Sequence, residues 1–432
     1  MICEGIRLNP FFLGGGILPL EKRRVVITGM GAVAPNGIGV ENFWESLVHG
    51  RSAVRRITHF DASSYPCRVA AEVPNFDPTD YMEPKVAKRL ARFAQFALAA
   101  SKMAIEDSEI DLDSVTPHRV GVVIGTGIGG GDCSENQHTV FMEKGLKRIN
   151  PLTAVMICAH SAAGIISCEL GIKGTNSTIS AGCTSGLDAI YSAYNTIRLG
   201  DADIMLAGSG EAPITPYIVA IFCASGLLSG CHDNPEKTVK PYDIEGDGTV
   251  LGEGGAALVL ENLQSALGRK AKIYGEILGY ASGNEAYNIF RIDPAGDGAA
   301  EVMKKALDNA RLKPADIGYI NAHGNGSPEY DLNETIAIKK VFGTLAYRIP
   351  VTSIKPVTGQ SFSVTGILQT IASLLTINTS IIPPTINHIS PQPNCDLDYV
   401  PDQCRESEVN NALMNSLGYG GGHTVVIVSK FR

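Results

Sequence analysis

The sequence predicts an α/β fold, and three features of the chain lead to that prediction. Short β-branched, apolar segments that fit buried strands alternate with segments whose apolar residues recur at helical spacing. Several of the strand-like segments run directly into glycine, as residues 120–125 do. The same succession of strand, glycine turn and helix appears in both halves of the chain. Alternating strands and helices of this kind build layered α/β domains.

Length, charge and cysteine content set the broad class of the protein. A chain of 432 residues is long enough for about two to three domain-sized units. The net charge of −8 gives no indication of nucleic-acid binding, and no apolar run reaches the roughly 20 residues that span a membrane. The ten cysteines are scattered without CxxC pairs, so a reduced, cytoplasmic compartment is the simplest interpretation.

The first elements follow from these patterns in order. Residues 1–23 are predicted to be an unstructured or loosely packed extension, because their apolar stretch is followed rather than preceded by charges, unlike a signal peptide. A strand is expected at 24–31, running into a glycine turn, and helices at 40–48 and 85–106. The strand at 120–125 leads into a glycine-rich loop. That loop lacks the Lys-Ser/Thr ending of a phosphate-binding P-loop, which favours close backbone approach instead.

The stretch around Cys183 carries the strongest chemical signal. Residues 178–181 are expected to form a buried strand, and from Leu187 onward apolar residues recur at helical spacing. Cys183 therefore lies on a sharp turn at a helix N-terminus, whose partial positive charge favours the nucleophilic thiolate. A cysteine that only packs as a small hydrophobe is the common alternative. The flanking Gly182 and Gly186 favour the functional interpretation, because they leave room for an ester to approach.

The second half repeats the pattern of the first. Residues 256–260 and 272–280 are expected to form paired strands, and a further strand ends at His323. A buried helix is expected at 363–376, and the glycine-rich turn 418–422 precedes the last strand.

These motifs also resemble a known family. The run Ala181-Gly182-Cys183-Thr184-Ser185-Gly186 resembles the nucleophile motif of the elongating β-ketoacyl-ACP synthases (ketosynthases), especially those of type II polyketide systems. The resemblance extends over about residues 24–430. It implies the thiolase fold, with five αβαβα layers and two pseudo-duplicated halves. The halves would be residues 24–262, which carry the nucleophile, and 263–432, which carry His323, Lys355 and Gln360.

The resemblance implies an acyltransferase of fatty acid or type II polyketide biosynthesis. An acyl group would pass from an acyl carrier protein (ACP) to Cys183, and malonyl-ACP would then lose CO₂ and attack that acyl group. The substrates would be phosphopantetheine thioesters on ACP, with no bound cofactor and no metal. The expected partners are ACP and a second subunit, either identical or another ketosynthase-like chain, without nucleic acid or membrane.

Site roles carry over residue by residue. His323 would hold the malonyl carbonyl as it becomes an enolate, and the backbone N–H groups of Cys183 and Tyr419 would form the oxyanion hole. Glu334 and Lys355 are expected to pair and to hold the geometry and charge of the site. The remaining expected contacts are the gate and acyl pocket at Gly418, Tyr419, Gly420 and Ile128, and the pantetheine contacts at Asn325 and Ser327.

Gln360 is the main departure from the family pattern, because elongating ketosynthases have a second histidine at this position. A glutamine amide still donates a hydrogen bond, but it cannot become cationic or relay a proton. Three outcomes stay open: decarboxylative condensation with Gln360 as donor, acyl transfer without decarboxylation, or a chain-length-factor-like partner of another ketosynthase. Retention of Cys183 counts against the last. His423 stands where the family usually has asparagine.

Overall fold

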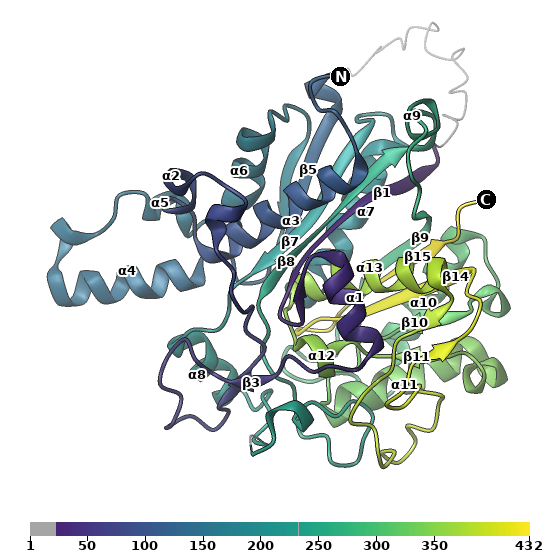
Figure 1. The fold of residues 1–432 in the computed structure, drawn as a ribbon. Helices are drawn as coiled ribbons and strands as arrows, with labels where there is room; N and C mark the ends of the chain where they lie inside the picture. The colour runs from purple at the N-terminus through teal and green to yellow at the C-terminus, as the bar shows by residue number, and fades with distance from the viewer. Residues whose placement is uncertain (1–22, 232) are drawn as a thin grey trace, which may run out of the picture.

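The computed structural model describes residues 23–231 and 233–432 (Figure 1), so the predicted extension at 1–23 lies, apart from Arg23, outside the described residues. The strands of the first half are β1 (Val25–Ala34), β5 (Val120–Gly125), β6 (Asn176–Ile179), β7 (Ile204–Glu211) and β8 (Gly254–Asn262). Those of the second half are β9 (Gly275–Asn284), β10 (Tyr319–Asn321), β11 (Val351–Thr352), β14 (Asn411–Leu417) and β15 (Gly422–Ser429).

The two halves have the same strand order. The first runs β6-β5-β7-β8-β1 and the second runs β11-β10-β14-β15-β9, so each strand has a counterpart at the same place in the other half. A short antiparallel pairing of β1 with β9, Val26 opposite Glu276, joins them into one continuous sheet. The prediction of two pseudo-duplicated halves is confirmed by this topology.

Helices complete five layers. Helices α3 (Arg92–Ser108) and α6 (Ser161–Leu170) pack on the outer face of the first half, and α10 (Asp297–Ala310) and α11 (Pro328–Phe342) pack on the outer face of the second (Figure 1). Between the halves, α7 (Ser185–Arg198) lies against α13 (Ser363–Thr379). Nearly every residue of α13 is buried, as expected for a helix enclosed on all sides. The thiolase-type layering is confirmed.

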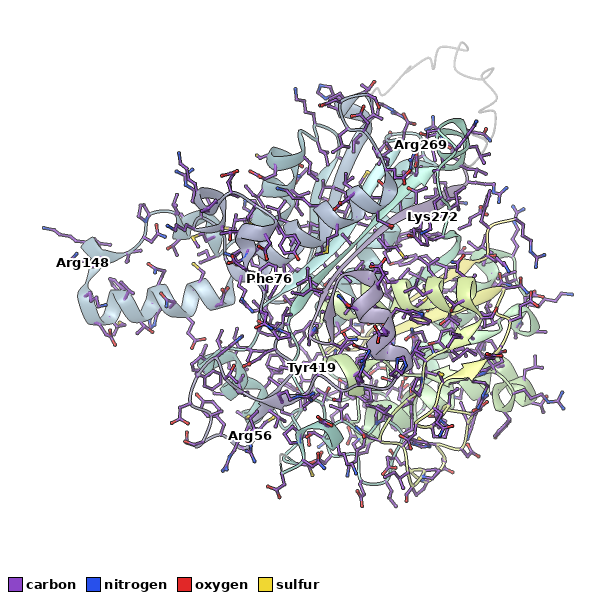
Figure 2. The ribbon with its side chains drawn as sticks, viewed as in Figure 1. Arg56, Phe76, Arg148, Arg269, Lys272 and Tyr419 are labelled. Carbon is purple, nitrogen blue, oxygen red and sulfur yellow. The ribbon has the colours of Figure 1, made fainter. Side chains whose placement is uncertain are left out.

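Shorter elements connect this frame. They are β2 (Gly37–Ile38), α1 (Val40–Val48), β3 (Arg55–Arg56), β4 (Val69–Ala70), α2 (Pro84–Ala87), α4 (Gly131–Lys144), α5 (Thr153–Met156), α8 (Pro216–Ala224), α9 (Leu263–Gly268), α12 (Lys355–Thr358), β12 (Ile381–Ile382) and β13 (Arg405–Glu406). Helix α4 projects away from the body in Figure 1, and Arg148 lies at the far end of this projection in Figure 2. Among the described residues, no helix is both long and apolar enough to cross a membrane.

Four expectations about local structure were wrong. Strand β1 continues past Gly29 and Gly31 instead of turning there. These glycines allow the close approach of α3, since a Cβ at either position would lie 2.1 Å from a helix carbonyl oxygen. Strands β8 and β9 do not pair, since β1 lies between them. Strand β6 is half-buried at the sheet edge. The helix expected at 85–106 is divided into α2 and α3.

Candidate active site

Cys183 lies where the sequence predicted, on the turn between β6 and α7. A single 3₁₀ turn at Gly182–Thr184 joins the strand to the helix. The Ser185 hydroxyl fixes this turn, because it accepts from the Ala181 N–H at 2.7 Å and donates to the Gly182 carbonyl at 2.8 Å. The thiol is therefore held at the N-terminal end of α7, with only 9% of the residue exposed.

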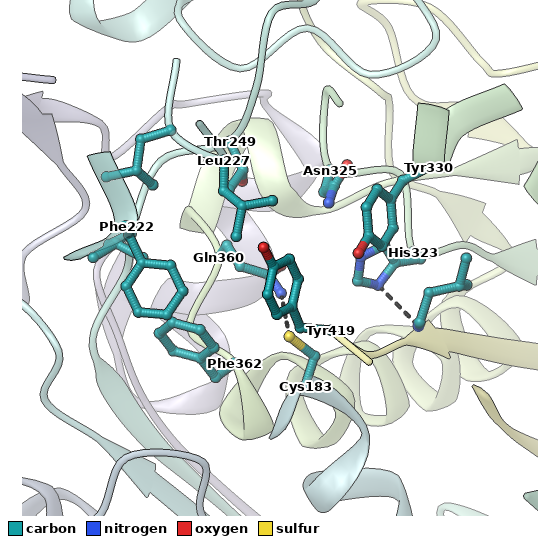
Figure 3. Close-up of a pocket in the computed structure, with 13 residues that line it drawn as sticks. Cys183, Phe222, Leu227, Thr249, His323, Asn325, Tyr330, Gln360, Phe362 and Tyr419 are labelled. Carbon is teal, nitrogen blue, oxygen red and sulfur yellow. Dashed lines mark hydrogen bonds between the residues drawn. The ribbon is translucent and has the colours of Figure 1, made fainter. Parts of the chain in front are cut away.

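The thiol faces a small cavity that gathers residues from both halves of the chain (Figure 3). Its volume is about 40 Å³, which holds only a few water molecules. We call it the Cys183 cavity. It is lined by Cys183, Phe222, Leu227, Leu228, Thr249, Leu251, His323, Asn325, Tyr330, Gln360, Phe362, Leu417 and Tyr419.

Gln360 contacts the nucleophile directly. Its Nε2 donates a hydrogen bond to the Cys183 Sγ at 3.1 Å, and Figure 3 shows both side chains turned into the cavity. Gln360 lies just after α12, and its backbone N–H donates a hydrogen bond to the Val250 carbonyl at 2.8 Å. Its Oε1 is buried without a hydrogen-bond partner. The amide is thus oriented by one bond to sulfur and keeps an unused acceptor.

The environment of Cys183 keeps the thiol protonated. Burial raises its pKa, and the Gln360 hydrogen bond, the Lys355 charge and the Tyr419 backbone N–H counteract this only in part. The expectation from the helix N-terminus alone, a stabilised thiolate, needs correction, since desolvation is the largest effect on a fully buried thiol.

His323 follows β10 and presents one defined tautomer to the cavity. Its Nδ1 accepts from the Leu417 backbone N–H at 3.2 Å (Figure 3), so the neutral ring carries its proton on Nε2. Burial and the nearby Lys355 charge lower the His323 pKa well below its ordinary value. The ring is therefore a neutral hydrogen-bond donor at physiological pH.

Lys355 and Glu334 do not form the direct ion pair that we expected. The Lys355 ammonium instead donates to the His323 carbonyl oxygen and lies 3.5 Å from Nδ1 of the same ring. The Glu334 carboxylate accepts from the backbone N–H groups of His323 at 2.7 Å and Gly324 at 2.9 Å. Both charged groups thus bind the backbone of the histidine segment, one at a carbonyl oxygen and the other at N–H groups. Burial lowers the pKa of Lys355 to about 8.

The 418–422 turn between β14 and β15 covers the site. Gly418 donates to the Gly422 carbonyl at 2.7 Å, which closes the turn, and the Tyr419 side chain lines the cavity while 40% of the residue stays exposed. The Tyr419 backbone N–H is close enough to Cys183 to lower the thiol pKa. A backbone N–H beside a nucleophile is the kind of donor from which an oxyanion hole is built.

Of the other residues predicted to contact substrate, some line the Cys183 cavity and some do not. Asn325 lines the cavity and its Oδ1 accepts from the Ser327 N–H at 2.9 Å, whereas Ser327 itself lies outside the lining. Ile128 does not line the Cys183 cavity. It lines a neighbouring cavity of about 710 Å³, which we call the Ile128 cavity.

Sequence reasoning missed a buried hydrogen bond between two side chains behind the 418–422 turn. His423 Nε2 and Glu285 Oε2 are 2.9 Å apart, and each side chain is 1% exposed. Glu285 also donates its backbone N–H to the Gly421 carbonyl at 2.9 Å. His423 therefore anchors the turn and does not replace the missing second histidine. The one feature of the sequence that pointed to His423 was that a histidine stands where the family usually has asparagine.

The chain matches two family models over most of its length. They are described as the N-terminal domain of beta-ketoacyl synthase, over residues 22–266, and its C-terminal domain, over residues 274–388. A 3-oxoacyl-[acyl-carrier-protein] synthase 2 of Synechocystis sp. is 42% identical over 413 residues, which are 96% of this chain and 99% of that protein. The protein of the same description from Staphylococcus aureus strain COL is 40% identical and matches 95% of this chain and 99% of that protein.

The chain is also similar to ketosynthases among the solved structures. A type II polyketide ketosynthase complex, AntDE with its acyl carrier protein AntF, superimposes with a TM-score of 0.89 at 35% identity and covers 95% of this chain and 100% of that chain. The ishigamide ketosynthase/chain length factor gives a TM-score of 0.90 at 32% identity, with the same coverage.

Proposed function

The chain belongs to the β-ketoacyl synthase family, an acyl-transferring group of condensing enzymes of fatty acid or polyketide synthesis, and we propose that it condenses through Cys183, His323 and Gln360. The observation that carries this is the 3.1 Å hydrogen bond from Gln360 Nε2 to the Cys183 Sγ in a cavity that also contains His323. The substrates are acyl and malonyl thioesters on the phosphopantetheine arm of an acyl carrier protein.

The first step is loading of the thiol. The Cys183 sulfur forms a bond to the thioester carbonyl carbon, and the backbone N–H groups of Cys183 and Tyr419 stabilise the oxyanion. The carbon–sulfur bond to pantetheine then breaks, and the released thiol takes the proton that Cys183 gives up. The Gln360 hydrogen bond and the Lys355 charge favour this deprotonation, because both lower the thiol pKa.

The second step is decarboxylation and carbon–carbon bond formation. The Nε2–H of His323 and the amide of Gln360 donate to the malonyl thioester carbonyl, so that loss of CO₂ leaves a stabilised enolate. The enolate carbon attacks the acyl group on Cys183. The acyl–sulfur bond breaks, the Cys183 sulfur that leaves takes up a proton from water, and the product is a β-ketoacyl thioester. Acylation frees the Gln360 amide for this role, since an acylated sulfur no longer needs its hydrogen bond.

A second candidate function is acyl transfer without decarboxylation. It is favoured by one observation, that the residue beside Cys183 is an amide, Gln360, which cannot relay a proton. The acceptor would then be an amine, an alcohol or another carbon nucleophile, and no CO₂ would be released.

We infer a dimer, with an identical chain or with another ketosynthase-like subunit. Large apolar side chains on α4 and the segment that follows it are exposed, including Leu146 at 75% and Met142 at 69%. Exposed apolar patches of this kind usually mark protein–protein contacts. Strand β6 also presents an open sheet edge, which is a site for pairing.

A cytoplasmic location and the division into halves at 262/263 remain part of the same proposal. The location is supported by the cysteines of the described segments, nine in number, all of which are free. The division is supported by the repeated strand order.

Intact-protein mass spectrometry tests the function. The protein is mixed first with acyl-ACP and then with malonyl-ACP, and Cys183→Ala is the control. We expect an acyl adduct that disappears as β-ketoacyl-ACP and CO₂ form. An adduct that persists with malonyl-ACP would favour the second candidate. Absence of any adduct on the reduced protein would overturn the enzymatic function and favour a chain-length-factor-like subunit.

A further inference from the structure

Glu211, the last residue of β7, is a fully buried carboxyl that the proposed chemistry does not use. Its Oε1 accepts from the Gly127 backbone N–H and from the Ser363 hydroxyl at 2.5 Å, and its Oε2 accepts from the Ile128 backbone N–H at 3.2 Å. Buried polar groups are normally paired. Here the three donors come from two segments that are far apart in the sequence, the glycine-rich loop after β5 and the start of α13.

Each of these segments carries a large apolar side chain. Ile128 belongs to the loop, and Phe362 immediately precedes Ser363 with φ at +42°. A non-glycine residue keeps such a backbone conformation only where its surroundings fix it. Ile128 and Phe362 pack in one apolar cluster with Cys183 and Ile218. Glu211 therefore ties together the backbones that carry two members of this cluster.

The cluster lies between two cavities of very different size. Phe362 lines the Cys183 cavity of about 40 Å³, whereas Ile128 and Ile218 line the Ile128 cavity of about 710 Å³. The smaller cavity has room for a few water molecules only. The larger cavity, on the other side of the cluster, has the room that an acyl chain of more than a few carbons on Cys183 would need.

The loop that carries Ile128 is seated directly between the carboxyl and the nucleophile turn. A Cβ added at Gly127 would lie 3.3 Å from a Glu211 carboxyl oxygen and 3.6 Å from the Gly182 Cα. A shift of the carboxyl therefore shifts the loop, and with it the side chain that borders the larger cavity.

We propose that Glu211 is a positioning residue that sets which acyl-chain lengths Cys183 accepts. It holds Ile128 and Phe362 in place as a barrier between the two cavities and takes no part in the bonds that form and break. This inference rests on the proposed function, because it presupposes that Cys183 is acylated.

The test measures the rate at which Cys183 is acylated by two small probes, butanoyl-pantetheine and dodecanoyl-pantetheine thioesters, by intact-protein mass spectrometry. In Glu211→Gln an NH₂ group replaces one acceptor oxygen and faces a backbone N–H, which releases the loop. We expect the ratio of dodecanoyl to butanoyl rates to rise about tenfold, with butanoyl loading within about twofold of wild type. Ser363→Ala, which removes one of the three donors, should raise the same ratio by a smaller factor.

Ile128→Ala is the matched control, because it removes part of the barrier itself. It should raise the ratio alone, and adding Glu211→Gln should then change the ratio by less than about twofold, since both act on one element. An unchanged ratio in Glu211→Gln overturns the proposal, as does an equal fall of both rates. If that variant does not fold, an unchanged ratio in Ser363→Ala overturns it. A wild-type protein that loads neither probe would contradict the proposed function itself, and this inference with it.

Discussion

The side-chain amide of Gln360 donates to the sulfur of Cys183 over 3.1 Å, although the two residues come from different halves of the chain. In the elongating ketosynthases that the sequence resembles, a histidine stands at this position. The contact therefore preserves a donor beside the thiol while it removes a group that can take up a proton.

Replacement of Gln360 by histidine tests how the glutamine at this position affects the rate of decarboxylation. We expect Gln360→His to speed decarboxylation of malonyl-ACP, because histidine can take up a proton, whereas Gln360→Ala should slow it by about 10²–10³-fold, the typical cost of losing one well-placed donor on developing charge. Loading of Cys183 should change much less. The measurement is CO₂ release against acyl-adduct formation, with Gln360→Ala as the control that lacks any donor. Equal rates for wild type and Gln360→Ala would show that this side chain takes no part.

Removal of the Glu334 carboxylate should be costly to stability. It accepts from the His323 and Gly324 backbone N–H groups, from the Tyr242 hydroxyl at 2.8 Å and from the Asn415 amide at 2.5 Å. Glu334→Ala leaves these donors buried without an acceptor, so we expect a loss of about 3–5 kcal/mol in unfolding free energy by chemical denaturation. Glu334→Gln, which keeps one acceptor, should lose less. A loss below about 1 kcal/mol in Glu334→Ala would contradict this account.

The His423–Glu285 pair should control the mobility of the 418–422 turn. His423→Ala leaves a buried carboxylate oxygen without its donor, which costs about 1–3 kcal/mol. We expect faster hydrogen exchange of the amides in this turn and slower acylation of Cys183. Glu285→Gln is the comparison that keeps a polar contact. Unchanged exchange in His423→Ala would mean that the backbone bond from Glu285 to Gly421 is sufficient to hold the turn.

If the exposed apolar side chains near α4 form the subunit contact, charged residues introduced there should disrupt the dimer. We expect the wild-type protein to be dimeric by light scattering, and the double variant Met142→Glu, Leu146→Glu to be monomeric with an unchanged circular dichroism spectrum. Met142 belongs to the last turn of α4 and Leu146 follows that helix, close in sequence to Arg148 at the far end of the projection (Figure 2), so the fold of the body should not change. A double variant that stays dimeric would place the subunit contact elsewhere.

The Glu211 carboxyl should contribute a pH dependence to stability. Burial raises its pKa from 4.5 to about 7, so between these values the folded state holds a proton that the unfolded state has released. The contribution to unfolding free energy is then largest below pH 4.5 and falls as pH rises toward about 7. Relative to Glu211→Gln, which does not titrate, the wild type should lose stability across this window. Parallel pH profiles of the two proteins would contradict the assignment.

The sequence by itself determined the alternation of strands and helices, the position of Cys183 at a helix start and the repeated halves. It did so because these features depend on local periodicity and on the positions of glycines, both of which can be seen in short stretches of sequence. The tertiary structure alone decided which strand lies beside which. It also placed Lys355 and Glu334 around the His323 segment and not against each other, and seated Glu211 beneath Ile128. Those contacts join residues that are far apart in the chain, so their geometry depends on packing that no local pattern records.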